Sequence, residues 1–272
     1  MISTEVGQHV DIDGLRTFYV KKGSGTPLVL IHGGSPGACA LVNWGANIDF
    51  LADSGFMVHA YDQPGYGRTD NPDDFSLEFR TRHAKAFIDA MHLDRYVLMG
   101  NSQGSYIVAR QALEDPRVEK LILVSSGTLA PRGASARSEE MSREHSERLA
   151  AYTPSLDNMR ALSMQTMYRP DVVTEEFVRL RYEMSTGKNA ESQTKRQGTP
   201  APRPVYGDLK NLKIPVLLMW GAHDSGVSLD RSLSLLESIP GAELHIFDNA
   251  AHWVQWDQAD RFNTIVRDFL KA

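Results

Sequence analysis

A serine between two glycines, in the segment Gly100-Asn-Ser-Gln-Gly104, carries the strongest chemical signal in the sequence. An apolar run at 96–99 precedes this segment, and a helix-like stretch, SYIVARQAL, follows it. In a strand–turn–helix context, G-x-S-x-G exposes the serine hydroxyl at a helix N-terminus, where backbone N–H groups and the helix dipole favour a developing oxyanion. The flanking glycines permit the tight turn. The spacing therefore predicts that Ser102 is a nucleophile.

A base and an acid that could activate this serine follow later in the chain. A hydroxyl is a weak nucleophile until a base takes its proton. His252 comes just after an expected strand at 244–247, and Asp224 comes just after another at 216–220. Hydrolases with a G-x-S-x-G turn place the three groups in the chain order serine, acid, histidine. We therefore predict a catalytic triad of Ser102, Asp224 and His252.

Other histidines and one other acid are weaker candidates for the base and the acid. One histidine adjoins the expected acid, but successive residues on an extended segment point to opposite sides. Three more lie on or at the ends of expected strands, where a structural role such as bracing a loop is the simpler interpretation. The alternative acid lies only four residues before the expected base. These weaker candidates are His223, then His32, His59 and His245, then Asp248.

A glycine-rich segment, His32-Gly-Gly-Ser-Pro-Gly37, follows an expected strand at 28–31. In hydrolases of this type, the oxyanion hole takes one N–H from the residue after the nucleophile and one from the loop after this strand. We therefore predict that the N–H groups of Gly34 and Gln103 hold the oxyanion. An ordinary glycine-rich turn is the alternative, whereas a phosphate loop is disfavoured because no Gly-Lys-Ser/Thr follows.

The elements that must position these groups alternate between short apolar runs and longer helix-like stretches. This pattern indicates parallel βα units and hence an α/β fold with a mostly parallel sheet flanked by helices. The continuous apolar character of the runs fits strands covered on both faces. Residues 15–21 alternate enough to form an antiparallel edge strand. The expected buried strands are 28–31, 57–61, 96–99, 120–124, 216–220 and 244–247, and the expected helices are near 76–92, 103–115, 229–238 and 257–270.

One segment, 131–205, interrupts this alternation. It is polar, charged and rich in Met and Arg, with helix-like stretches and no strong strand, and it separates two blocks that each look like part of one sheet. We predict a helical cap at 131–205 inserted into a core domain formed by 1–130 and 206–272. A disordered linker is the alternative, but the segment contains too many apolar residues for that: Leu162, Met164, Met167, Phe177, Leu180 and Met184.

The composition excludes several classes of function. The net charge is −5 and no basic run stands out, so nucleic acid is not expected as a partner. Cys39 is the single cysteine, which rules out an intrachain disulfide and a cysteine-rich zinc site. The first 30 residues lack a basic start followed by an apolar block, and the apolar runs are too short to span a bilayer. We therefore expect a soluble, cytoplasmic protein with no membrane partner.

Three segments together resemble the meta-cleavage product hydrolases, which hydrolyse carbon–carbon bonds in bacterial aromatic catabolism. The segments are His32-Gly-Gly-Ser-Pro-Gly-Ala38, Gly100-Asn-Ser-Gln-Gly104 and Ala251-His-Trp-Val-Gln-Trp256, and Asp62-Gln-Pro-Gly-Tyr-Gly67 is similar to many α/β-hydrolases. The resemblance runs from about residue 10 to the C-terminus and is weakest in the expected cap. It implies the α/β-hydrolase fold, with a mostly parallel eight-stranded sheet and an inserted helical cap. It also implies a homo-oligomer, a dimer or larger.

The resemblance implies a reaction as well. The substrate is a small-molecule dienoate, a 2-hydroxy-6-oxohexa-2,4-dienoate with a group at C6, and the products are a 2-hydroxypentadienoate and a carboxylic acid. No metal or organic cofactor takes part. Carried over by position, Ser102 attacks the C6 carbonyl with the help of His252 and Asp224. Further binding roles at the oxygenated end of the substrate fall to Asn43, Asn101 and Trp253.

Arg181 bears most directly on the class of substrate. It lies in Thr174-Glu-Glu-Phe-Val-Arg-Leu-Arg181, which is similar to the cap segment of the family that carries a dienoate-binding arginine. A carboxylate and its neighbouring 2-oxo group offer two planar acceptors, and a guanidinium donates a matching fork. A solvated cap arginine is the alternative, and Arg179 is the nearby competitor on another helical face.

The sequence also departs from the family pattern in four places. Gln103 replaces the usual Met after the nucleophile, which makes the expected pocket more polar, while the backbone N–H that the oxyanion hole needs is kept. Ser105 and Ser35 each replace a common Gly. Gly226 stands where many relatives have a bulky aromatic residue, so we expect extra room near the C6 substituent.

Two other functions are compatible with the same residues. The first is a carboxylesterase or lactonase that uses the same triad. The second is a ligand receptor or interaction protein that only keeps the fold, although a complete triad in the right order argues against it. Dehalogenase and epoxide hydrolase chemistry is disfavoured because those relatives use Asp where Ser102 stands.

Overall fold

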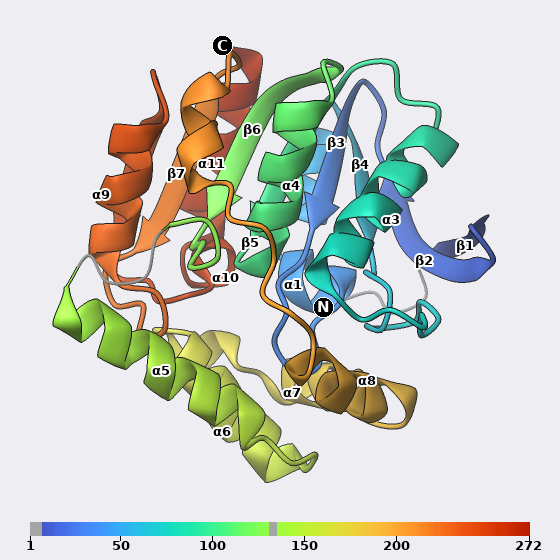
Figure 1. Cartoon of the computed structure of the whole chain (residues 1–272), viewed down its shortest axis with the longest axis vertical. Coiled ribbons are helices and arrows are strands. Elements are labelled where there is room, and N and C mark those ends of the chain that lie inside the picture. Colours follow the sequence, from blue (N-terminus) through green and yellow to red (C-terminus); the bar gives the residue numbers. More distant parts are fainter. Residues whose placement is uncertain (1–6, 131–134) are drawn as a thin grey trace.

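The computed structural model describes residues 7–130 and 135–272, and an eight-stranded sheet lies at its centre (Figure 1). The strand order is β1-β2-β4-β3-β5-β6-β7-β8. Every neighbouring pair from β4 to β8 is parallel, whereas β2 is antiparallel to both β1 and β4. In chain order the strands are β1 Gln8–Ile12, β2 Leu15–Lys22, β3 Thr26–Ile31, β4 Phe56–Tyr61, β5 Tyr96–Asn101, β6 Val118–Val124, β7 Val216–Gly221 and β8 Glu243–Phe247.

The helices follow the strands in the alternation that the sequence predicts. Each expected helix overlaps an observed one, at α3, α4, α9 and α11. Two short helices between β3 and β4 were not predicted, because five or six residues are too few to show a helical period. The α-helices are α1 Ala40–Trp44, α2 Ile48–Asp53, α3 Leu77–Ala90, α4 Gln103–Glu114, α5 Ala136–Ala150, α6 Leu156–Thr166, α7 Glu175–Glu183, α8 Lys188–Gln197, α9 Leu229–Ser238, α10 Val254–Asp257 and α11 Ala259–Lys271, and the 3-10 helices are η1 Pro170–Val172 and η2 Tyr206–Asn211.

The central strands are buried on both faces, which explains their continuous apolar sequences. Every residue of β5 and β7 is buried. On β3, Leu28 and Leu30 join one core cluster, whereas Val29 and Ile31 join the other, because successive side chains on a strand alternate between faces. Helices α3, α4 and α9 cover the near face in Figure 1, and α1, α2 and α11 supply residues to the cluster on the opposite face. The sheet is therefore the middle layer of an α/β fold.

The sheet edges differ from the prediction at two places. The strand at 15–21 is antiparallel as expected, but it is not an edge strand, because β1 pairs with its outer side. β1 is short and mostly exposed, so it has no apolar pattern to reveal it. The strand at 244–247 was expected to be buried, yet β8 is the opposite edge of the sheet, and Ile246 is 40% exposed.

The segment between β6 and β7 contains helices and, among its described residues, no strand. Residues 135–205 contain α5, α6, η1, α7 and α8, which gather at one end of the sheet in Figure 1. The first four residues of the expected cap, 131–134, lie outside the described residues. The division into a core at 1–130 and 206–272 and a cap at 131–205 stays a prediction, and this arrangement of helices and sheet agrees with it.

Within 7–130 and 135–272, no helix is long and apolar enough to cross a membrane. The same residues contain no group of three or more His, Cys, Asp or Glu side chains arranged to hold a metal ion.

Candidate active site

Ser102 lies in the turn that joins β5 to α4, in an unusual backbone conformation. Its φ and ψ angles are 55° and −120°, in a region that residues with a side chain rarely adopt. The turn is held because the Ser102 N–H donates to the Val124 carbonyl on β6 at 2.8 Å. Backbone strain of this kind persists where surrounding structure enforces it, and here it presents the serine at the N-terminus of a twelve-residue helix.

The glycines that flank Ser102 are required by close backbone packing. A Cβ atom at Gly100 would lie 2.5 Å from the Gly104 carbonyl carbon, so the chain folds back on itself across the turn. A Cβ atom at Gly104 would lie 2.2 Å from the Ile31 carbonyl oxygen at the end of β3. These approaches bring the serine turn against the loop that follows β3.

Replacing Gly104 with alanine is therefore expected to destabilise the fold. The new methyl group must push against backbone carbonyls, and overpacking of this kind costs about 1–3 kcal/mol. Gly207→Ala is the matched control, because its Cβ would meet no atom within 4 Å. Urea unfolding of the two variants measures the difference, and equal unfolding free energies would show that the turn yields easily.

Asp224 and His252 form a buried pair at the ends of β7 and β8. The His252 Nδ1 atom lies 2.7 Å from Asp224 Oδ2, and the other carboxylate oxygen accepts the N–H groups of Gly226 at 2.8 Å and Val227 at 2.9 Å. Burial by itself would raise the pKa of Asp224, but His252 and the two N–H groups hold that pKa below its ordinary value. The carboxylate therefore stays ionised and fixes the imidazole with Nε2 free to accept a proton.

A second carboxylate positions the loop that carries His252. Asp257 is buried and accepts the N–H of Ala251 at 2.9 Å, so it anchors the residue next to the histidine. The same carboxylate accepts the N–H groups of Tyr168 at 3.0 Å and Arg169 at 2.9 Å. This side chain thus connects the histidine loop to the segment between α6 and α7.

Ser102 and His252 line one large cavity of about 780 Å³ at the carboxyl ends of the parallel strands. Walls of this cavity come from the loops after β3 and β5, from the β7–α9 loop, and from α5 and α8 above them. In the part of the chain that the structure describes, no hydrogen bond joins the Ser102 hydroxyl to His252. The structure brings Ser102, His252 and Asp224 to one site, since Ser102 and His252 line the same cavity and Asp224 is paired with His252.

Gly34 and Gln103, the residues predicted to supply the oxyanion hole, line the same cavity as the serine. Gln103 is the first residue of α4, so its N–H has no acceptor within the helix. Gly34 also lines the cavity, and its carbonyl accepts the Tyr66 hydroxyl at 3.2 Å. A Cβ atom at Gly34 would lie 2.0 Å from Gln103 Oε1, which shows that the Gln103 side chain lies directly against the glycine loop.

The residues expected to bind the oxygenated end of the substrate divide into two layers. Asn101 and Trp253 line the cavity. Asn43 is fully buried and is not among the lining residues, which differs from its expected direct contact with substrate. Its Oδ1 accepts the Gly33 N–H at 2.9 Å, and its Nδ2 donates to Asn101 Oδ1 at 3.2 Å. Asn43 therefore holds the glycine loop and Asn101 in place from behind.

Arg181 lies behind the cavity wall rather than in it. It is completely buried, and it donates to the Pro36 carbonyl at 3.2 Å, Ser35 Oγ at 3.2 Å and Ser163 Oγ at 2.9 Å. Its guanidinium carbon lies 4.8 Å from the centre of the Trp253 ring. Burial lowers the pKa of Arg181 to about 10. The solvated alternative is thus wrong, and the competitor Arg179 is exposed and paired with Glu175.

The weaker candidates lie away from the triad or serve the fold. His32 is fully buried and accepts the Gln63 N–H at Nε2, and burial lowers its pKa to about 3, as expected for a loop brace. His59 is buried on β4, and burial lowers its pKa to about 4. The exposed Asp248 lies 3.6 Å from His223 rather than near His252. His245 lies on the edge strand β8.

Gly226 does not open the room that was expected beside the acid. A Cβ atom at Gly226 would lie 2.6 Å from Nδ1 of His145, a residue of α5 that was not predicted to be part of the site. The His145 ring lies 5.7 Å from the His252 ring, and burial together with His252 lowers the pKa of His145 to about 4. The space left by the missing aromatic residue is therefore filled by a neutral histidine from the helical segment.

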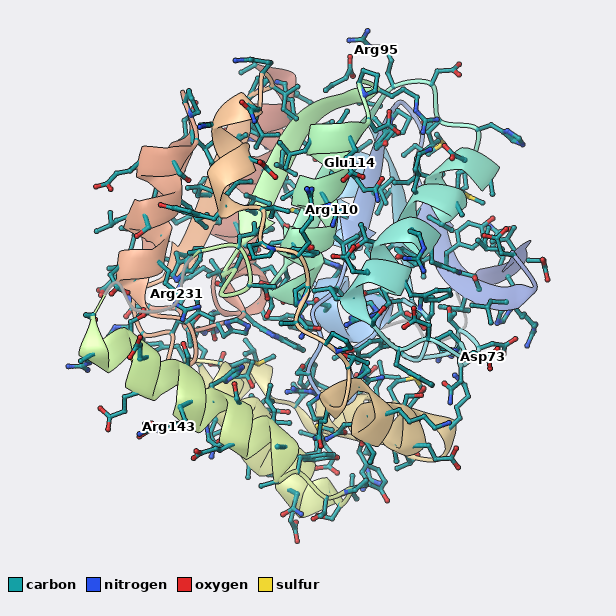
Figure 2. The ribbon with its side chains drawn as sticks, viewed as in Figure 1. Asp73, Arg95, Arg110, Glu114, Arg143 and Arg231 are labelled. Carbon is teal, nitrogen blue, oxygen red and sulfur yellow. The ribbon has the colours of Figure 1, made fainter. Side chains whose placement is uncertain are left out.

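Three arginines that line the cavity from helices were also missed. Arg80 comes from α3 and Arg196 from α8, in segments without any recognised motif. Arg231 comes from α9 and donates to the Gly127 carbonyl at 2.6 Å and Ser142 Oγ at 2.8 Å, so it connects α9 to α5, as its position in Figure 2 shows. A helix pattern predicts only that such residues are on a helix, and their convergence depends on the tertiary fold.

Comparison with known proteins agrees with this architecture. Residues 26–259 match the family described as the alpha/beta hydrolase fold. The chain is 34% identical over 267 residues to a 2-hydroxy-6-oxononadienedioate/2-hydroxy-6-oxononatrienedioate hydrolase of Burkholderia vietnamiensis, covering 94% of this chain and 91% of that protein. The chain therefore belongs to the α/β-hydrolase family and, within it, to the meta-cleavage product hydrolases.

Solved structures give the same result. A meta-cleavage product hydrolase from Pseudomonas fluorescens superposes with a TM-score of 0.85 at 32% identity and covers 98% of both chains. A 2-hydroxy-6-oxo-6-phenylhexa-2,4-dienoate hydrolase from a Rhodococcus strain superposes with a TM-score of 0.84 at 25% identity, covering 98% of this chain and 99% of that one. The protein is thus a hydrolase with the fold of enzymes that act on dienoates.

Proposed function

We propose that this chain hydrolyses a carbon–carbon bond in a 2-hydroxy-6-oxohexa-2,4-dienoate-type product of aromatic ring cleavage, using Ser102, His252 and Asp224. The observation that carries the proposal is the strained Ser102 turn opening into the same cavity as the buried Asp224–His252 pair. The relatives named as hydrolases of such dienoates support the choice of substrate. The products are a 2-hydroxypentadienoate and a carboxylic acid.

In the proposed mechanism, His252 Nε2 takes the Ser102 proton as Oγ attacks the C6 carbonyl of the ketonised substrate. The N–H groups of Gly34 and Gln103 hold the resulting oxyanion. Collapse of this intermediate breaks the C5–C6 bond, the electron pair passes through the conjugated chain to the C2 oxygen, and that dienolate oxygen receives the proton from His252 to give the 2-hydroxypentadienoate. The acyl group left on Ser102 is then hydrolysed by water, with His252 again acting as base and Asp224 balancing its charge.

Binding of the dienoate end is proposed to involve Asn101 and Trp253 directly and Arg181 through the wall. Arg181 has only neutral oxygen acceptors among the described residues, although a buried guanidinium is best stabilised by an anion. Ser35 lies between Arg181 and the cavity, since it contacts the guanidinium and lines the cavity. A modest rotation of this serine would let the substrate carboxylate reach the arginine.

Because Arg181 is buried behind the cavity wall, a second function is also a candidate, that of a carboxylesterase or lactonase with this triad. If Arg181 only braces the Ser35 loop, the remaining site has no special preference for a dienoate. Turnover of coloured C6-substituted dienoates, followed by loss of their visible absorbance, tests the proposal against hydrolysis of neutral esters. Rapid ester hydrolysis without any dienoate turnover would favour the esterase.

Replacing Arg181 with alanine is expected to lower kcat/KM for the dienoate by about 10- to 100-fold, because a charge-assisted hydrogen bond contributes about 1.5–3 kcal/mol. The value for a neutral ester is expected to change much less. Arg179→Ala is the matched control, because Arg179 is exposed. Equal losses on both substrates would make Arg181 a structural residue.

The proposal also covers the location, the oligomeric state and the cofactor requirement of the enzyme. We expect a cytoplasmic homo-oligomer, a dimer or larger, that needs no metal or organic cofactor. Sedimentation of the purified protein and activity after exhaustive chelation test the assembly and the metal independence separately.

A further inference from the structure

A small space beside His252 adjoins the catalytic cavity. Its volume is about 10 Å³. A single buried water molecule needs a volume of about 10–15 Å³ on this measure, so the space has the size for one water. The residues that line both the small space and the large cavity are His145, Thr166, Gly226 and His252.

The lining of the small space is mostly polar and changes from exposed to buried residues. Gln165 and Ser225 are exposed, whereas Thr166 and His252 are buried. Arg148 also lines the space, and it donates to the Ser225 carbonyl at 3.2 Å. A buried water typically makes about three hydrogen bonds to polar groups. The small space therefore suits water and offers it a short route from the surface to His252.

His145 lies on α5 and faces this space with an unpaired imidazole. Its ring nitrogens make no hydrogen bond to any residue of 7–130 or 135–272. The centre of its ring lies 5.7 Å from the centre of the His252 ring. At this separation one water molecule can hydrogen-bond to both rings. Burial lowers the pKa of His145 to about 4, so the ring is neutral near neutral pH and keeps a nitrogen that can accept a hydrogen bond.

The position of His145 is fixed from two sides. A Cβ atom at Gly226 would lie 2.6 Å from His145 Nδ1, so only a glycine lets the ring come this close to the loop after β7. The N–H of the same glycine donates to the Asp224 carboxylate. Helix α5 is tied to that loop by a hydrogen bond between the hydroxyls of Ser138 and Ser228 at 2.6 Å. The ring is therefore held at a defined distance from the buried acid.

The second half of the proposed reaction needs a water that is held in this way. The water oxygen attacks the carbonyl carbon of the acyl group on Ser102 and gives a proton to His252. The bond from that carbon to Oγ then breaks, and Oγ takes the proton back from His252. In a cavity of about 780 Å³, a water that contacts only His252 has no fixed orientation, whereas a second partner holds it for attack.

We infer that His145 and the small space beside it form a water site, in which His145 and His252 together hold the water that hydrolyses the acyl-enzyme. His145 is thus a positioning residue, since it acts through the water. The inference rests on the proposed function only for the acyl group on Ser102, which an esterase with the same triad would share.

The test measures how the acyl-enzyme divides between water and added methanol, with p-nitrophenyl butyrate as the substrate. Methanol is too large for a space that holds one water, so it must reach the acyl group from the large cavity. His145→Leu is therefore expected to raise the ratio of methyl butyrate to butyrate by about 3- to 10-fold, as for one lost hydrogen bond. The rate of nitrophenolate release in the first turnover is expected to change by less than about twofold.

Three further variants make the result specific. His145→Gln can still donate and accept a hydrogen bond, so it is expected to recover most of the wild-type ratio. Gly226→Ala keeps the histidine but displaces its ring, so it is expected to raise the ratio. Arg143→Leu is the matched control on the exposed face of the same helix (Figure 2), and it should leave the ratio unchanged.

A crystal structure of the intact protein gives a readout that does not depend on turnover. A water within hydrogen-bond distance of both His145 and His252 is expected in the wild type, and it should be lost in His145→Leu. The absence of that water, a ratio that His145→Leu leaves unchanged, or equal slowing of acylation and hydrolysis would overturn the water site. A ratio that depends on His145, without any dienoate turnover, would keep the water site and reject the proposed function.

Discussion

Replacing Ser102 with alanine is expected to lower kcat by about 10⁴- to 10⁶-fold, the loss typical of a serine hydrolase that loses its nucleophile. The hydroxyl is the atom that must form the covalent bond, and the strained turn gives it no other role, since the described residues offer it no hydrogen-bond partner. Binding of substrate should persist, because the cavity walls remain. The visible absorbance of a dienoate in the presence of the variant would then decay at close to the uncatalysed rate.

A neighbouring serine provides the control for this experiment. Ser126 is also buried beside the turn, and its hydroxyl donates to the Ser102 carbonyl at 3.3 Å. Ser126→Ala removes an oxygen from the same region but not from the reacting position, so its kcat is expected to stay within about tenfold of wild type. Labelling with a phosphonate probe should fail only for Ser102→Ala. Substantial activity in that variant would mean that another group attacks the substrate.

The serine turn could be predicted from the sequence because its requirements are local. The strand, the two glycines and the helix are contiguous, and each has a short-range signature that tertiary packing did not override. Asp224 and His252 could be placed for a related reason. Each follows a parallel strand, and the carboxyl ends of parallel strands meet at one edge of a sheet.

The sequence could not show which candidate binding residues contact the cavity and which are buried behind its wall. Arg181 and Asn43 have the residue types of binding groups, but both lie one layer behind the wall. The prediction that β8 is a buried strand was also wrong. β8 has the apolar sequence of a central strand, but it lies at the edge of the sheet, and the lack of an outer neighbour exposes Ile246.

The sequence also could not predict which side chains from distant helices lie close together in the fold. Arg80, Arg196 and His145 come from three helices, and no spacing in the chain relates them. The structure shows that these helices share one cavity. At Gln103 and Gly226 the sequence departs from the family pattern, and only the structure explains these two residues. The Gln103 side chain accepts a hydrogen bond from Arg80, and Gly226 packs against His145.

Asp224→Asn is expected to lower kcat by about 10³- to 10⁴-fold without unfolding the protein. In the wild type, Oδ1 accepts two backbone N–H groups and Oδ2 accepts the proton on His252 Nδ1. The amide oxygen of the variant can keep the two backbone bonds, which leaves the amide NH₂ group facing the imidazole. The ring must then carry its proton on Nε2, so it can no longer accept the Ser102 proton.

The test separates this loss of the correct tautomer from a general loss of structure. The melting temperature of Asp224→Asn is expected to stay close to wild type, because both backbone hydrogen bonds survive, while phosphonate labelling of Ser102 slows with kcat. Asp248→Asn is the matched control, since that carboxylate is exposed and lies near His223 instead. A variant at position 224 that keeps its activity, with loss at position 248, would assign the acid to Asp248 and require His252 to take its orientation from another element.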